Sequence, residues 1–202
     1  MIRRIKEDDY NLLKGLVSQV HELHCTNRPD IYLDGNPLPK EYFENILKNE
    51  NNINLVYEEN NIIKGLLLAE KKENNKISIA RERKIYFIND IVIDKKYRRQ
   101  GIGKKLYNYL LELSKKEGLD AVELNVWAFN ISAIKFYSSL GMSVKNMKLE
   151  KILSTSEVEQ ENVAINITSN VKSRKVSIEK DNYFKKIILV RCYYYRLKNI
   201  KI

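Results

Sequence analysis

The chain has 202 residues, of which 44% are hydrophobic and 31% are charged, a balance typical of one globular domain with a substantial core. No window approaches the roughly 18 consecutive apolar residues of a membrane span, and the first residues lack the apolar core of a signal peptide. These features predict a cytoplasmic protein that does not bind a membrane.

The net charge of +10 is spread unevenly along the chain. Residues 171–202 contain 10 Lys or Arg and 2 Asp or Glu, so most of the excess lies in this C-terminal stretch. Because the remainder is nearly balanced, the overall charge does not predict nucleic acid as the partner of the folded domain. The two cysteines, Cys25 and Cys192, lack the spacing of a zinc site, which predicts free thiols and no metal.

Hydrophobic periodicity predicts the elements of the first half of the chain. They are, in order, a strand over 2–6, a helix from 8 to about 27, a helix over 41–47, and strands over 54–58, 62–70 and 85–94. The segment Glu59-Asn60-Asn61 is typical of a hairpin turn between the second and third strands. The strand over 85–94 is apolar on both faces and is therefore predicted to be central. Strict alternation places Ile85, Phe87, Asn89, Ile91 and Ile93 on one face and Tyr86, Ile88, Asp90, Val92 and Asp94 on the other.

The second half continues with alternating helices and strands. The pattern predicts a helix from 102 to Gly118, a strand over 122–126, a helix from 130 to before Gly141, and strands over 142–146 and 147–153. The expected fold is α/β, with a mixed, mostly antiparallel sheet of about seven strands flanked by helices. Residues 1–153 would form the domain, and residues 154–202 a C-terminal extension of unknown role.

A turn rich in glycine and cations, Arg98-Arg99-Gln100-Gly101-Ile102-Gly103, joins the central strand to the next helix. A helix that starts after such a turn has unpaired backbone N–H groups at the positive end of its dipole. Glycine leaves these groups accessible to an anion. The turn therefore predicts a phosphate-binding site.

Two motifs together resemble the GNAT acyl-CoA N-acyltransferase superfamily. They are Arg98-x-x-Gly101-x-Gly103 after the central strand and Asn130-x-x-Ala133-x-x-x-Tyr137 at the start of a later helix. The resemblance covers about residues 2–153 and implies a GNAT-like fold that uses acetyl-CoA as acyl donor. It also implies the residues that bind this donor, which are Ile91, Val92, Ile93, Arg98, Arg99, Gln100, Gly101, Ile102, Gly103, Lys104, Asn130 and Ala133.

The same resemblance implies that Tyr137 is the general acid. A phenol with an ordinary pKa near 10 is protonated at neutral pH and can donate a proton to a leaving thiolate. The acceptor amine must lose a proton, and Asp90 is the candidate base. The stretch is locally similar to spermidine/spermine N-acetyltransferases, which have a Glu-Asp pair where Asn89-Asp90 stand here, and an amide cannot act as a base.

Each of these residues also has a structural interpretation. Tyr137 could be an aromatic packed beside Phe136, Asn130 a helix cap, and Asp90 a carboxylate paired with a cation. Weaker candidates for contact with the acceptor are Asn89 in the central strand, Asp30 and Tyr32 after the first helix, and Trp127, which could instead pack in the core. His21, His24 and Cys25 lie on the first helix, and His21 and Cys25 form an i, i+4 pair that could suggest a metal, but a third strong ligand is missing nearby.

The sequence favours an N-acetyltransferase that acts on a primary amine of a small molecule by direct attack in a ternary complex. Acetylation of a protein lysine or N-terminus is one alternative. A non-catalytic CoA-binding regulatory module whose basic tail recruits a partner is another. Interleaved cations and aromatics near the C-terminus fit an added strand, a homodimer contact or a disordered end better than a nucleic-acid surface.

Overall fold

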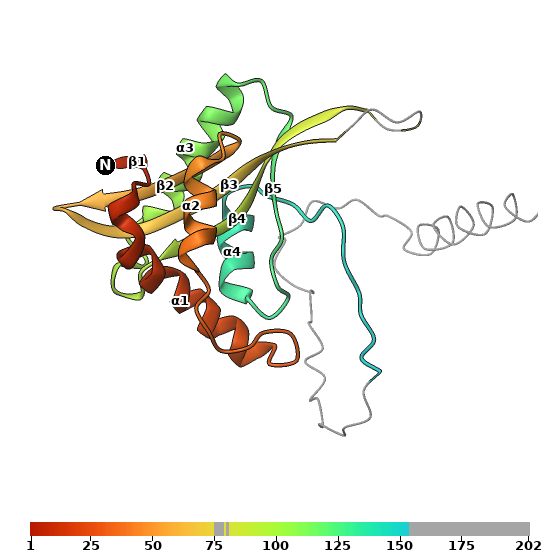
Figure 1. Cartoon of the computed structure of the whole chain (residues 1–202). Helices are drawn as coiled ribbons and strands as arrows, with labels where there is room; N and C mark the ends of the chain where they lie inside the picture. Colours follow the sequence, from red (N-terminus) through yellow and green to blue (C-terminus); the bar gives the residue numbers. More distant parts are fainter. Residues whose placement is uncertain (75–78, 80, 154–202) are drawn as a thin grey trace, which may run out of the picture. The chain divides into compact units, whose positions relative to one another are not determined.

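The computed structural model of the protein describes residues 1–74, 79 and 81–153 (Figure 1). The chain divides into two units, Met1–Lys148 and Leu149–Ile202. All helices and strands described below belong to the first unit. The strand, dimer contact and nucleic-acid surface considered for the C-terminal extension fall outside the described residues.

One mixed sheet runs through the first unit. Its strands are β1 (Ile2–Arg4), β2 (Asn52–Glu59), β3 (Ile62–Asn74), β4 (Arg83–Ile93) and β5 (Ala121–Leu124). They follow one another in the order β1-β2-β3-β4-β5. Every neighbouring pair is antiparallel except β4 and β5, which are parallel. The predicted α/β fold with a mixed, mostly antiparallel sheet is therefore confirmed.

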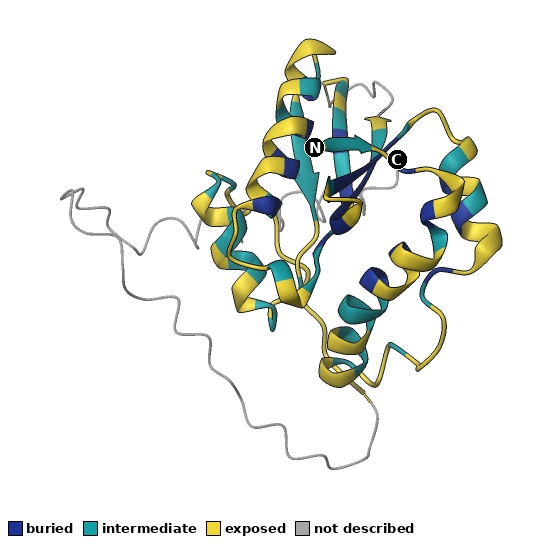
Figure 2. Cartoon of the chain, turned by 90° about the vertical axis from the view of Figure 1, so that its left-hand side faces the viewer, coloured by how far each residue is buried: buried dark blue, intermediate teal, exposed yellow. Residues whose placement is uncertain are grey.

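Helices cover both faces of this sheet (Figure 1). They are α1 (Tyr10–Asn27), α2 (Lys40–Lys48), α3 (Ile102–Lys116) and α4 (Ile131–Ser139), with the short 3-10 turns η1 (Glu7–Asp9) and η2 (Lys95–Tyr97). One hydrophobic core joins α1 and α2 to the sheet, and a second joins α3 to the opposite face. Figure 2 shows the buried residues on the strands and on the inward sides of the helices.

The prediction of strands over 142–146 and 147–153 is wrong. The described residues form five strands, and residues 142–153 contain none. Val144 and Met147 are 74% and 71% exposed. Their apolar pattern suggested strands, but a strand is stabilised by burying one face, and these side chains have little to pack against.

The hairpin turn predicted between the second and third strands is confirmed. Asn60 and Asn61 both have positive φ angles, 53° and 59°, and they join β2 to β3. Two consecutive left-handed residues match the right-handed twist of a hairpin, and asparagine tolerates this conformation better than most residues.

A bulge in β4 changes which side chains share a face. Leu68 pairs with Asp90, whereas the next residue of β3, Ala69, pairs with Ile88, so Asn89 is the additional residue. As a result Ile88 packs in the α3 core together with Ile91, while Val92 belongs to the α1–α2 core. The strict alternation predicted for β4 is therefore wrong beyond Ile88, because a bulge reverses the facing of all residues that follow it.

The pairing of β4 with β5 ends early. The last pair is Ile88 with Leu124, yet β4 continues to Ile93. In the part of the chain that the structure describes, no strand pairs with β4 on that side from Asn89 to Ile93. This leaves an edge of backbone N–H and C=O groups beside the start of α3, open to an added strand-like ligand.

Gly65 in β3 allows α3 to lie close to the sheet. A Cβ at this position would lie 2.8 Å from Ile93 Cδ1, 3.1 Å from Ile102 Cγ2 and 3.2 Å from Leu106 Cδ1. Ile102 and Leu106 are buried, so they have little room to move. The absence of a side chain at residue 65 therefore sets the distance between the sheet and the first turn of α3.

We expect Gly65→Ala to lower the free energy of unfolding by about 1–2 kcal/mol, because overpacking outweighs the entropy that alanine removes from the unfolded chain. Chemical denaturation would measure this change. Gly15→Ala is the matched control, since residue 15 lies inside α1 with no atom within 4 Å of the added Cβ. That substitution should raise stability by about 1 kcal/mol. A Gly65→Ala protein as stable as the wild type would contradict the tight packing.

Candidate active site

The first turn of α3 has the backbone geometry of an anion site. Arg99 and Gly101 have positive φ angles, 64° and 76°, and Gly101 is the N-cap residue of the helix. No side chain caps this end of α3. The N–H groups of Ile102, Gly103 and Lys104 therefore lack the partners that a capping side chain would supply. A phosphate group fits this end of the helix dipole.

The cations of the turn differ in their availability. Arg98 Nε donates to Ile93 O at 3.1 Å, which ties the turn to the end of β4. Lys105 Nζ donates to Tyr57 OH at 3.2 Å. The exposed side chains that remain beside the turn are Arg99, Gln100 and Lys104. Arg99 and Lys104 supply positive charge around the uncapped N–H groups, and the neutral amide of Gln100 can add hydrogen bonds.

Gly103 brings α4 against the start of α3. A Cβ at residue 103 would lie 3.1 Å from Phe136 Cζ and 3.6 Å from Ile93 Cγ1. Only a residue without a side chain permits this approach without displacing Phe136. The turn, the end of β4 and the helix that carries Tyr137 are therefore held together at one place.

Asn130 caps α4, which agrees with the structural interpretation of this residue as a helix cap. Its Oδ1 accepts a hydrogen bond from Ala133 N at 3.1 Å. This cap occupies the carbonyl oxygen and is compatible with a second contact through Nδ2. Asn130 and Ala133 thus lie in the first turn of α4, and Tyr137 follows on the same helix.

Asp90 and Tyr137 influence each other electrostatically. Burial raises the pKa of Asp90 to about 6. Burial, followed by the charge of Asp90, raises the pKa of Tyr137 to about 12. Among the described residues, no hydrogen bond or ion pair compensates the Asp90 carboxylate. Asp90 and Tyr137 thus lie close enough to interact electrostatically, and these pKa values leave Asp90 mostly ionised and Tyr137 protonated near pH 7.

A pocket of about 270 Å³ lies between α2 and the sheet. It is lined by Tyr42, Asn45, Ile46, Asn49, Asn52, Asn54, Leu68, Glu70 and Asn89. Asn89 is the bulge residue next to Asp90, so the pocket adjoins the candidate base. Burial, then the charge of Asp90 and that of Glu70, raises the pKa of Tyr42. Asn89 is among the residues predicted from the sequence, whereas Tyr42 and Glu70 are not. No sequence motif predicts how α2 packs over β2, β3 and β4.

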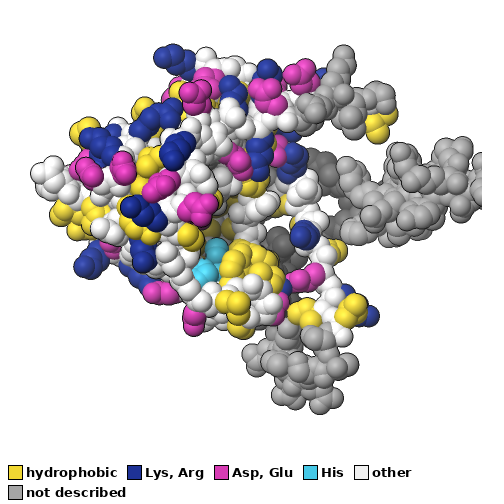
Figure 3. All heavy atoms as spheres, in the orientation of Figure 1, with side chains coloured by type: hydrophobic (Ala, Val, Ile, Leu, Met, Phe, Trp, Pro, Cys, Tyr) yellow, Lys and Arg dark blue, Asp and Glu magenta, His cyan; other side chains and the backbone are white. Residues whose placement is uncertain are grey.

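The weaker acceptor candidates fall into two groups. Trp127 Nε1 donates to Tyr32 OH at 3.2 Å, and both rings belong to a cluster with His24 and Phe129. Figure 3 shows this hydrophobic patch beside the histidines. Asp30 instead accepts two hydrogen bonds from the Arg28 guanidinium, at 2.9 and 2.7 Å, and is 44% exposed. Arg28 Cζ also lies 5.0 Å from the centre of the Trp127 ring, so this ion pair links Asp30 to the cluster of Tyr32 and Trp127.

His21 and Cys25 connect α1 to the loop that follows it. His21 Nε2 lies 2.9 Å from Leu33 O and 3.4 Å from Cys25 Sγ. Within the described ranges, no group of three or more His, Cys, Asp or Glu side chains could hold a metal ion. Desolvation, then the nearby Asp34, raises the pKa of the Cys25 thiol, which opposes a nucleophilic role. Cys192 lies outside the described residues.

Comparison with known proteins agrees with this geometry. Residues 17–142 match the acetyltransferase (GNAT) family. Because this span is more than half of the chain, the protein belongs to that family. The family resemblance inferred from the two motifs is thereby confirmed, and the acyl donor of this family is acetyl-CoA.

In the described part of the chain, no helix has the length and apolar character needed to cross a membrane.

Two curated relatives match shorter segments. An uncharacterized N-acetyltransferase of Methanocaldococcus jannaschii is 34% identical over 106 residues, which make up 52% of this chain and 46% of that protein. The ribosomal protein bS18-alanine N-acetyltransferase of Escherichia coli is 39% identical over 54 residues, or 27% of this chain and 36% of that enzyme. The chain thus spans less than half the length of these relatives.

Solved structures support the fold over a longer span. A mutant of the BH1408 protein from Bacillus halodurans superposes with a TM-score of 0.75 at 29% identity, over 76% of this chain and 99% of that one. An aminoglycoside N-acetyltransferase in complex with CoA superposes with a TM-score of 0.57 over 75% and 98% of the two chains. Its 14% identity makes it a likeness of fold alone.

We expect Asp90→Asn to stabilise the protein at about pH 8 but not below pH 4. A carboxyl group whose pKa rises from 3.8 to about 6 on folding favours the folded state below pH 4, and this contribution is lost as the pH rises through about 6. The shift corresponds to at most about 3 kcal/mol. Denaturation at both pH values would measure the difference between variant and wild type.

Asp8→Asn is the control, because this exposed residue lies in η1, away from the pocket. It should change stability by less than about 0.5 kcal/mol at either pH. A gain in the Asp90→Asn protein that is equal at both pH values would show that burial of the charge is not its cause.

Proposed function

We propose that this protein is an acetyl-CoA-dependent N-acetyltransferase that acetylates a primary amine of a small molecule by direct attack in a ternary complex. The observation that carries the proposal is that Phe136 packs against Gly103 beside the end of β4, which brings the neighbouring Tyr137 to where the charge of Asp90 acts on its hydroxyl. Family membership and the uncapped start of α3 support acetyl-CoA as the donor.

The residues present fit this donor. The N–H groups of Ile102, Gly103 and Lys104 would hold its pyrophosphate, and Arg99 would add positive charge. The open edge of β4 beyond Ile88 would pair with the pantetheine arm. When bound, acetyl-CoA supplies the thioester whose acyl carbon is attacked.

Two proton transfers fall to side chains of this protein. An alkylamine arrives largely protonated at neutral pH, and the Asp90 carboxylate, ionised above about pH 6, accepts the proton directly or through water. The nitrogen then forms the new bond to carbon while the carbon–sulfur bond breaks, and it loses a second proton, which replaces the one that Tyr137 donates. The Tyr137 hydroxyl, protonated at all relevant pH values, gives its proton to the leaving thiolate.

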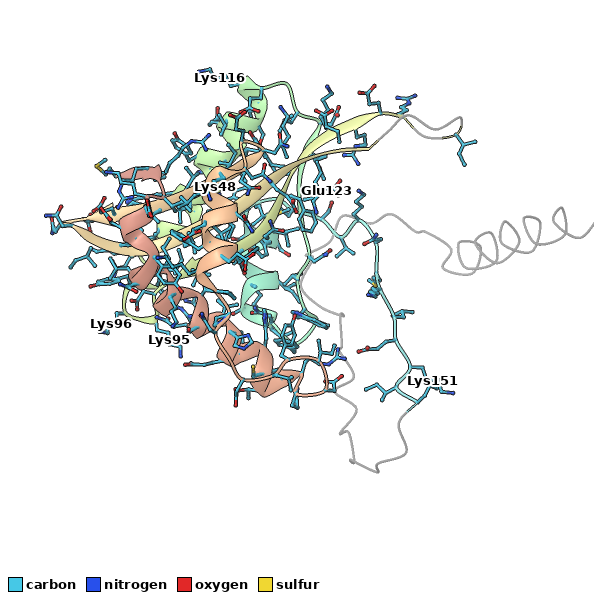
Figure 4. All side chains as sticks on the ribbon, viewed as in Figure 1. Lys48, Lys95, Lys96, Lys116, Glu123 and Lys151 are labelled. Carbon is cyan, nitrogen blue, oxygen red and sulfur yellow. The ribbon has the colours of Figure 1, made fainter. Side chains whose placement is uncertain are left out.

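The size of the pocket supports a small acceptor. A space of about 270 Å³ beneath α2 suits a small amine better than a folded protein surface. The bS18-alanine N-acetyltransferase, by its name, acts on a protein N-terminus, so a peptide acceptor is the second candidate. Among the described residues, Lys48, Lys95 and Lys116 stand at the ends of three different elements, so these three cations do not form one basic patch (Figure 4).

The proposal is tested by incubating the protein with acetyl-CoA and a panel of small amines, and by following the release of free thiol. We expect turnover with at least one small primary amine and none with acetyl-CoA alone. Peptides with free N-termini and lysine-containing peptides form the second arm of the panel. If only the peptides were acetylated, the proposed acceptor would be a peptide and not a small molecule. The absence of turnover with every acceptor would refute acetyl transfer.

We expect Tyr137→Phe to lower kcat by roughly 10²–10⁴-fold, the usual contribution of a general acid, with little change in CoA affinity. Steady-state kinetics would measure the change in kcat, and titration with CoA would measure the change in affinity. Tyr109→Phe is the matched control, because Tyr109 is 47% exposed on α3. If Tyr137→Phe retained full activity, Tyr137 would be only a packed aromatic beside Phe136.

A further inference from the structure

Four aromatic rings form a closed cycle between the end of α1 and the segment that leads into α4. His24 stacks on Tyr32, with ring centres 4.9 Å apart and an angle of 28° between the planes. Trp127 stacks on Phe129 at 5.8 Å and 15°. Edge contacts join Tyr32 to Trp127 at 6.0 Å and His24 to Phe129 at 6.2 Å. Because each ring contacts two others in a favourable geometry, the four rings hold one another in place. We refer to these four residues as the aromatic latch.

One directional bond closes the aromatic latch. The Trp127 indole donates from Nε1 to Tyr32 OH at 3.2 Å. The Arg28 guanidinium lies over the same indole, with Cζ 5.0 Å from the ring centre, and is itself held by two hydrogen bonds to Asp30. The edge and the face of Trp127 are therefore both held by residues that follow α1.

The aromatic latch acts on the segment from which α4 starts. Residues 125–130 lie between β5 and α4 and belong to no strand or helix. Within this segment Trp127 O accepts a hydrogen bond from Asn130 N at 2.9 Å, and Asn130 Oδ1 accepts one from Ala133 N at 3.1 Å. The position of the indole is thus passed on, through two hydrogen bonds, to the first turn of α4.

The direction of α4 depends on contacts at its two ends, because the helix contributes no fully buried residue to a core. Toward its C-terminal end, Phe136 packs against Gly103, where an added Cβ would lie 3.1 Å from the ring. One such contact lets a helix rock about it. The aromatic latch supplies a second point of attachment, at the N-terminal end.

We propose that Tyr32 is a positioning residue, which sets the direction of α4 through its hydrogen bond to Trp127 and thereby places the Tyr137 hydroxyl relative to Asp90. The inference rests on the proposed function, in which Tyr137 is the general acid. It gives Tyr32 and Trp127 a role other than the contact with the acceptor that was predicted from the sequence. It also makes the end of α1 a support of the site.

The kinetic test uses Tyr32→Phe, which keeps the ring that stacks on His24 and removes the oxygen that accepts the Trp127 N–H. We expect kcat to fall about five-fold, which corresponds to the net free energy of one typical hydrogen bond, with an unchanged KM for the acceptor. In a Tyr137→Phe background the same substitution should have no further effect, because no hydroxyl is left to position.

Tyr10→Phe is the matched control. It removes a comparable hydrogen bond, from Tyr10 OH to Leu38 O at 3.1 Å, at the opposite end of α1. This variant should keep the kcat of the wild type. Melting curves of all variants establish that each is folded.

Two further measurements do not depend on turnover. Trp127 is the only tryptophan among the 202 residues, so its fluorescence reports on the aromatic latch. In Tyr32→Phe we expect a red shift of the emission and stronger quenching by acrylamide, because water reaches the freed indole. Hydrogen exchange at the Ala133 and Ile134 amides, both bonded to Asn130, should be about five-fold faster. Neither measurement should change in Tyr10→Phe.

The outcomes separate this inference from the proposed function. A higher KM with an unchanged kcat would make Tyr32 a contact of the acceptor, and an equal loss of kcat with and without the Tyr137 hydroxyl would make its role independent of the acid. Either result would overturn the inference while acetyl transfer stands. Unchanged exchange at Ala133 and Ile134 would overturn it as well. If no acceptor released thiol, the proposed function would fall, and the exchange rates would still support or overturn the placement of α4 by the aromatic latch.

Discussion

The insertion of one residue into β4 decides the chemistry of this site. The bulge at Asn89 turns Asp90 away from the α3 core and onto the face covered by α1 and α2. It lies where β5 stops pairing with β4. The same short stretch of strand therefore presents both the backbone edge proposed to bind the donor and the carboxylate proposed to act on the acceptor. Without the bulge, the side chain of residue 90 would point into the core that contains Ile88.

The position of Asp90 is unfavourable for stability but suits the role of base proposed for it. A partly buried carboxylate without a partner in the described structure holds a raised pKa, about 6, because burial disfavours its charged form. A carboxylate with this pKa is a stronger base than an exposed one and is still ionised at neutral pH. Tyr137, nearby, is shifted in the direction that keeps it protonated. Burial of both groups, with a smaller contribution from the charge of Asp90 on Tyr137, thus sets the protonation states that the proposed base and acid need.

Close packing holds the parts of this site together. Gly65 brings α3 to the sheet, and Gly103 brings α4 to α3, in each case because a side chain would meet Ile93 or Phe136. Gly101 has a different role, since an added Cβ would meet nothing and its positive φ is what the turn requires. Sequence analysis recognised Gly101 and Gly103 as parts of a phosphate-binding turn. The contribution of Gly103 to helix packing could not be seen there, because Phe136 is distant in sequence.

By itself, the sequence determined the family, the hairpin turn at Asn60-Asn61, and the turn that would hold the donor, because these features depend on local backbone preferences and short spacings. It also named Asp90 and Tyr137, although their roles remain proposals. Only the tertiary structure decided the facing of β4, the absence of strands over 142–153, and the pocket that joins Tyr42, Glu70 and Asn89. A bulge is invisible in an alternating pattern until the partner strand is known. A pocket exists only when helix α2, remote in sequence from β4, packs over the sheet.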